Sequence, residues 1–484
     1  MTQFTNFGGN IHFRPRRLFE PETEDELLTL LRLHRSGCIR VIGARHSWSD
    51  VIVSNDTVID MRKFCNVAVA EVADGYQVTV GAGCRIKDLL AALNQQGLTL
   101  PALGLITEQS IAGAIATGTH GSGRHSLSHY IQQIRIACFP DGNDEPRIVD
   151  LRGGSDEAEI DLQAARCSLG CLGVVVSVTL PCVTQYNVVE QAAFGDSVEE
   201  MLAFEARSPL QQFFLVPHRW SYMAQERAAT TEPRRGWAGL YRVYWYCLID
   251  IGLHLAIKLA AAWLKSRLLV RFFFRRLVLS LIFPRWRVVD RSDRMLVMEH
   301  ELFRHLELEA FVPAGQIVPA ARFVELVLKQ AAGESVSVPA EVEQQLRDAE
   351  LWNDFNALAG RYLHHYPVCF RKVLRDNTLL SMASGEDHAW YAISFITYVQ
   401  SRDRFYEMAT FLARSLRVLH RGRIHWGKWF PLDAAAVEQM YPQRDQFLAV
   451  CRRFDPQGVF ANEFVRRTLR TDLAPLPPEN GPRQ

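Results

Sequence analysis

Two short segments rich in small residues constrain this chain most, because their backbone is built to come close to a partner. The first spans residues 43–48 and reads GARHSW, and the second spans residues 110–123 and reads SIAGAIATGTHGSG. Glycine, alanine and serine let backbone N–H groups approach an anion such as a pyrophosphate. Neither segment has the pattern of a Walker loop or of a nicotinamide-binding turn. Taken alone, however, such loops are more often ordinary turns.

Strand and helix signals alternate around these loops. Thr23 and Glu26 form a capping box, which predicts a helix over residues 23–36. The apolar spacing of residues 85–96 predicts an amphipathic helix, and the β-branched run at residues 173–180 predicts a strand. The first part of the chain therefore has the pattern of a βαβ-rich domain of about 180 residues.

Composition narrows the class of protein. Of the 484 residues, 48% are hydrophobic and 22% are charged, so the chain can bury a large core and is not disordered as a whole. The net charge of +1 argues against a nucleic-acid partner. Ten cysteines without a Cys-x-x-Cys pair argue against a disulfide scaffold and a zinc site, and we expect no metal site. The N-terminal segment lacks the apolar run of a signal peptide, so we expect a cytoplasmic protein that is not secreted.

The segment at residues 240–284 combines apolar, aromatic and basic residues. Charges interrupt it at Asp250, Lys258, Lys265, Arg267, Arg271, Arg275 and Arg276. We expect no transmembrane helix, because no stretch approaches the ~20 apolar residues that a spanning helix needs. Two interpretations stay open: an amphipathic segment in a membrane interface, or a pair of core helices covered by lysine and arginine stems.

Further blocks join the two loops in a pattern that resembles a known family. They are GCLGVV at residues 170–175, RIHWGK at residues 423–428 and FDPQGVFAN at residues 454–462. In this order the blocks resemble the FAD-dependent vanillyl-alcohol oxidase superfamily. The likeness is greatest to the aldonolactone and alditol oxidases, which include L-gulonolactone oxidase and D-arabinono-1,4-lactone oxidase. Residues 190–300 carry little of this resemblance.

The resemblance implies an α+β fold of the vanillyl-alcohol oxidase type. Two α/β subdomains would bind FAD, and a cap domain with an antiparallel sheet would cover the substrate. We accordingly assign residues 1–183 to the FAD-binding domain and residues 184–430 to the cap, with residues 431–470 returning to the FAD-binding domain. Residues 471–484 are rich in proline and polar residues, and we expect them to be disordered.

The resemblance also implies how FAD would be held. His46 stands where family members bond a histidine covalently to the flavin, so we expect covalent FAD; without the resemblance, a histidine that only hydrogen-bonds to the backbone would be the simpler interpretation. Small residues of the second loop would leave oxygen access to the flavin. The implied cofactor contacts are Gly43, Ala44, Arg45, His46, Ser47, Trp48, Ser110, Gly113, Ala114, Thr117, Gly118, His120, Gly121, Ser122, Gly123, Gly173, Val174 and Val175.

Five residues are implied as catalytic candidates. Lys428 would place a positive charge beside the flavin or act as a desolvated base, and His425 would orient it. In the family's Pro-x-Glu-x-Arg stretch, Arg371 is kept but Cys369 replaces the glutamate. Ser394 stands where relatives place histidine or asparagine. No histidine adjoins Cys369 in the sequence to activate it as a nucleophile.

These departures from the family pattern concern the substrate. In the family, a glutamate and a histidine at these positions would polarise a polyol hydroxyl. Because this chain lacks both, its pocket is better suited to a larger or more apolar alcohol than to a small sugar. Together with residues 240–284, this indicates a lipid-linked or membrane-derived alcohol, or a membrane quinone as electron acceptor.

We therefore expect an FAD-dependent oxidoreductase that oxidises a CH–OH group by hydride transfer to the flavin. Its donor would be a sugar lactone, a polyol or a larger apolar alcohol, its acceptor oxygen or a quinone, and its membrane contact peripheral. Two alternatives stay open. One is an FAD-dependent reductase or desaturase acting on a C–C bond of a lipid or secondary metabolite. The other is a membrane-associated flavoprotein whose active site has decayed.

Overall fold

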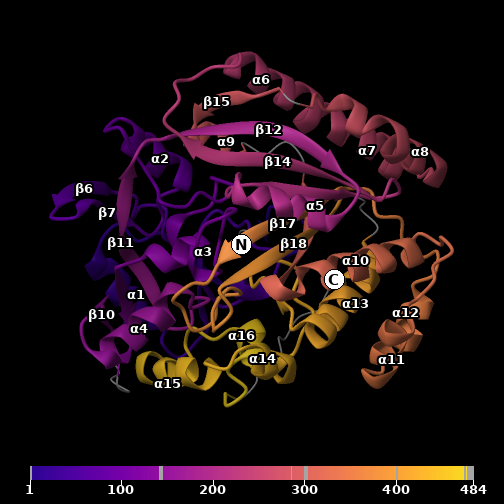
Figure 1. Cartoon of the computed structure of the whole chain (residues 1–484). Helices are drawn as coiled ribbons and strands as arrows, with labels where there is room; N and C mark the ends of the chain where they lie inside the picture. The colour runs from indigo at the N-terminus through magenta and orange to yellow at the C-terminus, as the bar shows by residue number, and fades with distance from the viewer. Residues whose placement is uncertain are drawn as a thin grey trace.

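The molecule consists of an N-terminal part, which carries both small-residue loops, and a cap built on one large sheet (Figure 1). The computed structural model describes residues 3–140, 145–284, 286–298, 304–398, 402–473 and 476. Of the tail that we expected to be disordered, residues 474, 475 and 477–484 lie outside the described residues.

A three-stranded parallel sheet positions the first loop. Its strands, in spatial order, are β3 (Arg17–Phe19), β5 (Thr57–Asp60) and β4 (Ile39–Ile42). Helix α1 (Glu24–His34) makes the crossover from β3 to β4 that a parallel sheet needs. The side chain of Thr23 accepts a hydrogen bond from the Glu26 N–H at the start of α1, as the capping box predicts. The first loop therefore begins where β4 ends.

An antiparallel sheet, ordered β10-β9-β11-β7-β6 with β8 paired to β11, carries the second loop. Its strands are β6 (Val67–Val72), β7 (Gly75–Gly81), β8 (Leu98–Thr99), β9 (Gln133–Cys138), β10 (Arg147–Arg152) and β11 (Val174–Thr184). The helices that accompany it are α2 (Ile86–Asn94), α3 (Ile111–Ala116) and α4 (Asp156–Arg166). The predicted apolar face of α2 is buried, and the second loop runs through α3.

The cap is an eight-stranded antiparallel sheet ordered β15-β12-β14-β13-β17-β18-β16-β19. Its strands are β12 (Asn187–Gly195), β13 (Gln212–Val216), β14 (Ser221–Thr230), β15 (Val288–Arg291), β16 (Leu306–Pro313), β17 (Val368–Leu374), β18 (Ala389–Thr397) and β19 (Arg423–Ile424). Its main helices are α10 (Ile317–Ala331), α11 (Ala340–Asp348), α12 (Trp352–Ala357) and α13 (Asp403–His420). This architecture confirms the predicted α+β fold, with a parallel and an antiparallel sheet in the N-terminal part and an antiparallel sheet in the cap.

The last helices lie against the N-terminal part rather than against the outer cap (Figure 1). They are α14 (Ala434–Met440), α15 (Arg444–Phe454) and α16 (Glu463–Thr468). Helix α15 packs against α4, and the Phe139 N–H donates to the Phe454 carbonyl at 3.1 Å. The Ile39 N–H donates to the Val459 carbonyl at 2.9 Å, which ties β4 to the chain's far end.

Residues 238–263 form one helix that begins with α6 (Ala238–Tyr244) and includes α7 (His254–Ile257), with π-helical turns between and after them. A second helical stretch follows, from α8 (Arg267–Phe272) to residue 281. Our expectation about spanning length is wrong: the helix Ala238–Trp263 has 26 residues and is long and apolar enough to cross a membrane, judged by length and composition only. Its 26 residues include only three charged ones, Arg242, Asp250 and Lys258.

Candidate active site

One cavity of about 590 Å³ lies between the N-terminal part and the cap sheet. Both small-residue loops, the segment at 423–428 and the strands β16, β17 and β18 contribute to its wall. The predicted residues on the wall are Gly43, Ala44, Arg45, His46, Ser47, Trp48, Ser110, Gly113, Thr117, His120, Gly173, Val175, Cys369, Arg371, Ser394, His425 and Lys428. Segments far apart in the sequence therefore meet around one space, whose volume is in the range of small-molecule sites.

The first loop is held from two sides. Because Gly43 has no side chain, the second loop comes very close: a Cβ on Gly43 would lie 2.0 Å from the Ser110 Oγ. On the other side, the Trp48 N–H donates to the Gly427 carbonyl at 2.8 Å. The loop thus bridges the second loop and the 423–428 segment.

The wall around the first loop fits the FAD that the resemblance implies. Ala44 and Arg45 line the cavity, and their backbone N–H groups donate to no residue in the described part of the chain. Arg45 is in the left-handed region, with φ 59°. Successive N–H groups in such a bend form a small concave donor site that suits a diphosphate.

Six predicted cofactor contacts do not lie on the cavity wall: Ala114, Gly118, Gly121, Ser122, Gly123 and Val174. Ala114 and Val174 are fully buried in the hydrophobic core. Gly118 takes a left-handed φ of 75°, at the residue after the C-cap of α3. Their assignment as cofactor contacts stays a prediction, and core packing and the bend after the helix also account for small residues there.

The end of the second loop packs against neighbouring backbone. A Cβ on Gly121 would lie 2.2 Å from the Leu103 carbonyl oxygen, and the Gly123 N–H donates to a β17 carbonyl at 2.7 Å. Ser122 donates through its Oγ to the Gln211 carbonyl. These residues attach the loop to the cap, and this explains their small size without a cofactor.

Two buried glutamates of β16, Glu307 and Glu309, were missed by the sequence predictions. Residues two apart in a strand share a face, and both side chains line the cavity. A signal was present in the sequence: Leu306 to Phe311 reads LELEAF, in which two acids interrupt an otherwise apolar strand. Acidic residues are rarely fully buried unless they are paired.

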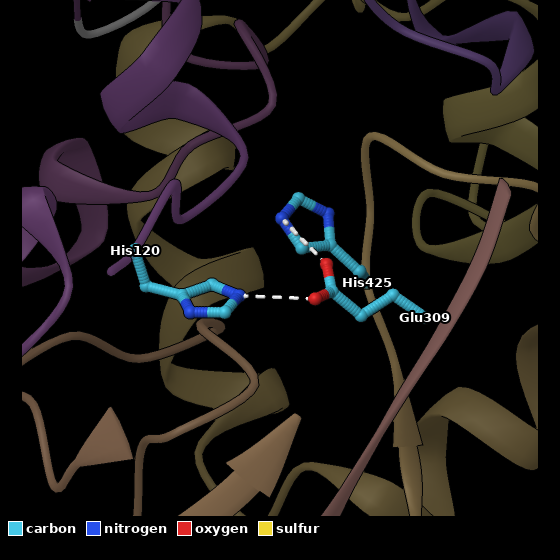
Figure 2. A group of neighbouring side chains, drawn as sticks. All are labelled: His120, Glu309 and His425. Atoms are coloured by element: carbon cyan, nitrogen blue, oxygen red, sulfur yellow. Dashed lines mark ion pairs between the residues drawn. The ribbon is translucent and has the colours of Figure 1, made fainter. Parts of the chain in front are cut away.

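Glu309 is surrounded by hydrogen-bond donors and positive charges. In the sheet register, Ser394 lies between Cys369 on β17 and Glu309 on β16. The Ser394 Oγ donates to Glu309 Oε1 at 2.7 Å, and the Arg371 Nη1 lies 3.8 Å from the same oxygen. His120 and His425 approach the carboxylate from the N-terminal part and from the segment after β19 (Figure 2).

The hydrogen positions of the two histidines follow from their partners. The Nδ1 of His120 lies 2.9 Å from the Gly121 carbonyl, and its Nε2 lies 3.4 Å from Glu309 Oε1. Both ring nitrogens of His120 therefore face hydrogen-bond acceptors. His425 differs, because its Nδ1 accepts a hydrogen bond from the Gly427 N–H at 3.0 Å. Its hydrogen is therefore on Nε2, which lies 3.9 Å from Glu309 Oε2.

Electrostatics keep Glu309 ionised and His425 neutral. Burial alone would raise the pKa of Glu309, but the charge and hydrogen bond of His120, together with the charge of Lys428, hold that pKa well below its usual range. Burial lowers the pKa of His425 to about 3. The site thus presents an ionised carboxylate at Glu309.

The same three side chains have the composition of a metal site. The ligand atoms of His120, Glu309 and His425 lie within 4.8 Å of one another, and two histidines with one carboxylate are a known ligand set. Arg371, however, places a guanidinium 3.8 Å from the carboxylate, where it would repel a cation. This neighbour favours proton chemistry over metal binding.

Lys428 is on the wall, but it is paired with a carboxylate. Its Nζ lies 2.5 Å from Glu307 Oε2 and 4.3 Å from the centre of the Trp48 ring. Its side chain is 16% exposed. The cation that we expected beside the flavin is therefore largely neutralised by Glu307, and Trp48 covers it.

Cys369 and Arg371 have different roles from those of the family's Glu–Arg pair. Burial raises the pKa of Cys369 to about 11, so its thiol is protonated at neutral pH and is a poor nucleophile. The Arg371 Nε donates to Gln212 Oε1 at 3.1 Å. The expectation that the site lost its acidic group is wrong in part, because Glu309 supplies a carboxylate from β16.

Toward residues 238–282 the cavity wall carries many apolar residues, beside the Glu190–Arg227 ion pair and Asp250. The apolar residues come from the cap sheet and from residues 238–282: Phe214, Val216, Met223, Ile249, Leu253, Val278, Leu279, Ile282 and Ile396. This part can hold a long apolar group while the polar end holds a hydroxyl.

His46 lies on the cavity wall, as predicted for the covalent link. Its ring stacks on Phe7 with centroids 4.8 Å apart. Burial lowers the pKa of His46 to about 4, so the imidazole is neutral at physiological pH. A neutral ring nitrogen is the form that can add to an electrophile.

Two known protein families match this chain, one over its N-terminal part and one over most of the rest. Residues 15–143 match the family described as FAD binding domain, and residues 178–468 match the family described as D-arabinono-1,4-lactone oxidase.

Similar proteins cover nearly the whole chain. A long-chain alcohol oxidase from an uncultured marine euryarchaeote is 43% identical over 97% of this chain and 98% of its own length. L-gulonolactone oxidase from Bos taurus is 26% identical, with 96% and 98% covered. The crystal structure of cholesterol oxidase from Brevibacterium sterolicum superposes with a TM-score of 0.72, covering 96% of each chain at 14% identity, so its likeness concerns the fold.

Proposed function

We propose that the donor of this enzyme is a long-chain primary alcohol. The product is then the aldehyde. The chain belongs to the D-arabinono-1,4-lactone oxidase family and is an FAD-dependent oxidase of alcohol or lactone donors. One observation carries this choice: a buried carboxylate, Glu309, lies in a cavity that also has many apolar residues on its wall. The long-chain alcohol oxidase relative, at 43% identity, supports it.

In this proposal the alcohol lies with its hydroxyl at Glu309 and its chain along the apolar wall. Bound FAD supplies the acceptor for the carbinol hydride. Glu309 takes the hydroxyl proton, and Ser394 and His120 hold the carboxylate in place. Arg371 faces the same oxygen and balances its charge.

The two loops would hold the cofactor, with the N–H groups of Ala44 and Arg45 at the diphosphate. His46 would form the covalent link to the flavin. Oxygen or a membrane quinone would take the electrons from the reduced enzyme. We place the protein in the cytoplasm, in peripheral contact with a membrane.

The two alternatives have less support. A reaction at a C–C bond does not need a buried carboxylate aimed at a hydroxyl, and the relatives are named as oxidases of alcohols or lactones. A decayed site does not fit either, because Glu309 has an ordered set of donors around it.

A substrate series tests the proposal. Purified holoenzyme is mixed without oxygen with hexanol, dodecanol, hexadecanol or L-gulono-1,4-lactone, and loss of the oxidised flavin absorbance is followed. We expect the rate of bleaching at low substrate concentration to rise from hexanol to hexadecanol and to exceed that with the lactone. Faster bleaching by the lactone than by any alcohol would contradict the proposal. Repeating reoxidation with oxygen and with a quinone identifies the acceptor.

A further inference from the structure

A helical hairpin lies on the outer side of the cap (Figure 1). Many of its apolar side chains are exposed. We use the word hairpin for residues 238–282, which lie beyond β12 and β14 in the figure. Exposed apolar side chains form two groups along its first helix, each with spacings of three or four residues, and one more follows past the turn. They are Leu240, Val243 and Tyr246, then Leu255, Leu259 and Trp263, and then Leu268. Trp263 and Leu268, beside the turn, are 73% and 77% exposed. Soluble monomers rarely expose apolar side chains in such number on one element.

The opposite face of the hairpin belongs to the core of the cap. Leu253, Ile257 and Phe274 are buried in one cluster with Val216 of β13 and with Tyr398. The helix cannot cross a bilayer without pulling this face away from the cap. The geometry therefore suits a helix that lies in the plane of a membrane surface, with one face in the protein and the other in lipid.

The charge of the hairpin favours an anionic surface. Residues 251–284 contain no aspartate or glutamate but include Lys258, Lys265, Arg267, Arg271, Arg275 and Arg276. Two copies of such a face would repel each other across a twofold axis. Arg267, Arg271 and Arg275 also donate to carbonyls of the cap, and Asp250 is the one acid of the hairpin. Lys265 and Arg276 are exposed beside the apolar face, and that combination matches the acyl chains and anionic headgroups of a lipid leaflet.

The cavity of the active site reaches this hairpin. Ile249, Leu253, Val278 and Ile282 form part of its apolar wall. Tyr246 is also on the wall and is 47% exposed, so the wall ends close to the outer surface of the hairpin.

We infer that the hairpin docks on an anionic lipid bilayer and that the alcohol passes from the leaflet, between the helices of the hairpin, into the cavity. The second half of this inference rests on the proposed function; the docking itself does not. Membrane attachment would then place the apolar end of the cavity against the acyl chains, so a long-chain alcohol need not cross water.

Vesicle flotation tests the docking. Holoenzyme is mixed with vesicles of phosphatidylcholine alone or with added phosphatidylglycerol, and bound protein is measured after centrifugation. We expect binding that increases with phosphatidylglycerol and decreases with salt. Trp263→Ser combined with Leu268→Ser is expected to weaken partition about tenfold or more. Leu33→Ser is the matched control, because Leu33 on α1 is 67% exposed and lies on another face.

A second flotation experiment tests the contribution of positive charge with the variant Lys265→Glu. Arg16→Glu, on the N-terminal part, is its control. Loss of binding to phosphatidylglycerol vesicles in the first variant and not in the second is expected. The inference is overturned if wild-type protein floats with neither vesicle, or if it forms a dimer in solution that the Trp263 and Leu268 changes dissociate.

A kinetic experiment tests the lipid route. We expect the double variant to lose activity toward hexadecanol presented in vesicles while it keeps wild-type activity toward hexanol in solution. Equal rates for wild type and variant on vesicle-borne hexadecanol would overturn the route, even with docking intact. If no alcohol is oxidised, the proposed function fails, and the flotation result still decides the docking.

Discussion

The backbone N–H of Trp48 donates to the carbonyl of Gly427 at 2.8 Å, which joins the first loop to the segment that carries Lys428. The Ser49 Oγ adds a second bond, to the Trp426 carbonyl at 2.5 Å. The two ends of the chain are thus connected by protein contacts alone at the cavity. Such contacts fix the loop before the cofactor arrives, which reduces the ordering needed for binding.

Replacing Ser49 with alanine should show this connection. The variant leaves the buried Trp426 carbonyl without its donor, and we expect the free energy of unfolding to fall by about 1–3 kcal/mol. Ser415→Ala is the control, because its Oγ donates to the Phe411 carbonyl within α13, away from the loop. Denaturant unfolding should show losses in both variants, whereas flavin content should fall only in Ser49→Ala. Equal flavin content would contradict the connection.

Glu309→Gln should remove the proton acceptor while keeping the side-chain volume. We expect the rate of anaerobic flavin reduction by a saturating alcohol to fall about 100-fold or more. Glu334→Gln is the control, since Glu334 is a cap residue that accepts from the Trp220 indole away from Glu309. A rate within threefold of wild type would exclude Glu309 as the base.

The pH profile should report the depressed pKa of Glu309. The base must be ionised, so kcat/KM is expected to be flat from neutral pH downward and to fall only below the usual carboxyl range. His120→Gln removes the paired cation, so the acid limb should move up by about one pH unit or more. Initial rates after brief exposure to each pH separate this effect from unfolding. An acid limb near neutrality in wild type, or an unmoved limb in the variant, would contradict the assignment.

Local sequence signals were enough to predict several secondary-structure elements and the meeting of the two loops. The capping box at Thr23 and Glu26 correctly located the start of α1, and the small residues near 43 and 110 do meet at one cavity. Local signals could not predict the helical geometry of residues 238–263. Its π-helical turns and its one buried face depend on the cap sheet beneath, and counting charges along the segment hid how apolar its longest stretch is.

The active site shows the same limit. Reasoning by resemblance looked for a glutamate on β17, at Cys369, and found none. The carboxylate comes instead from Glu309, two strands away, and only the register that aligns Cys369, Ser394 and Glu309 reveals it. At Gly121 and Gly123, close packing against neighbouring backbone also requires a glycine, which the sequence pattern does not show.

His46→Ala should test the covalent link. We expect wild-type protein to keep yellow colour through acid precipitation and to show flavin fluorescence in a denaturing gel, and the variant to show neither. His12→Ala, on the exposed strand β2 (His12–Phe13), is the control and should behave as wild type. Flavin released by acid from wild-type protein would show that the attachment is noncovalent.

Lys428→Met should separate stability from catalysis. Removing the cation leaves Glu307 as a buried carboxylate whose close ammonium partner, 2.5 Å away, is gone. Leaving one member of a buried pair unpaired costs about 3–5 kcal/mol, so the free energy of unfolding should fall by an amount of that order.

The double variant Lys428→Met with Glu307→Gln removes both charges, and most of the lost stability should return. Denaturant unfolding of the four proteins in the cycle measures the coupling between the two side chains. If Lys428 also acts on the bound flavin, the anaerobic reduction rate should stay low in the double variant although its fold is restored. Recovery of both stability and rate would show that Lys428 serves only to neutralise Glu307.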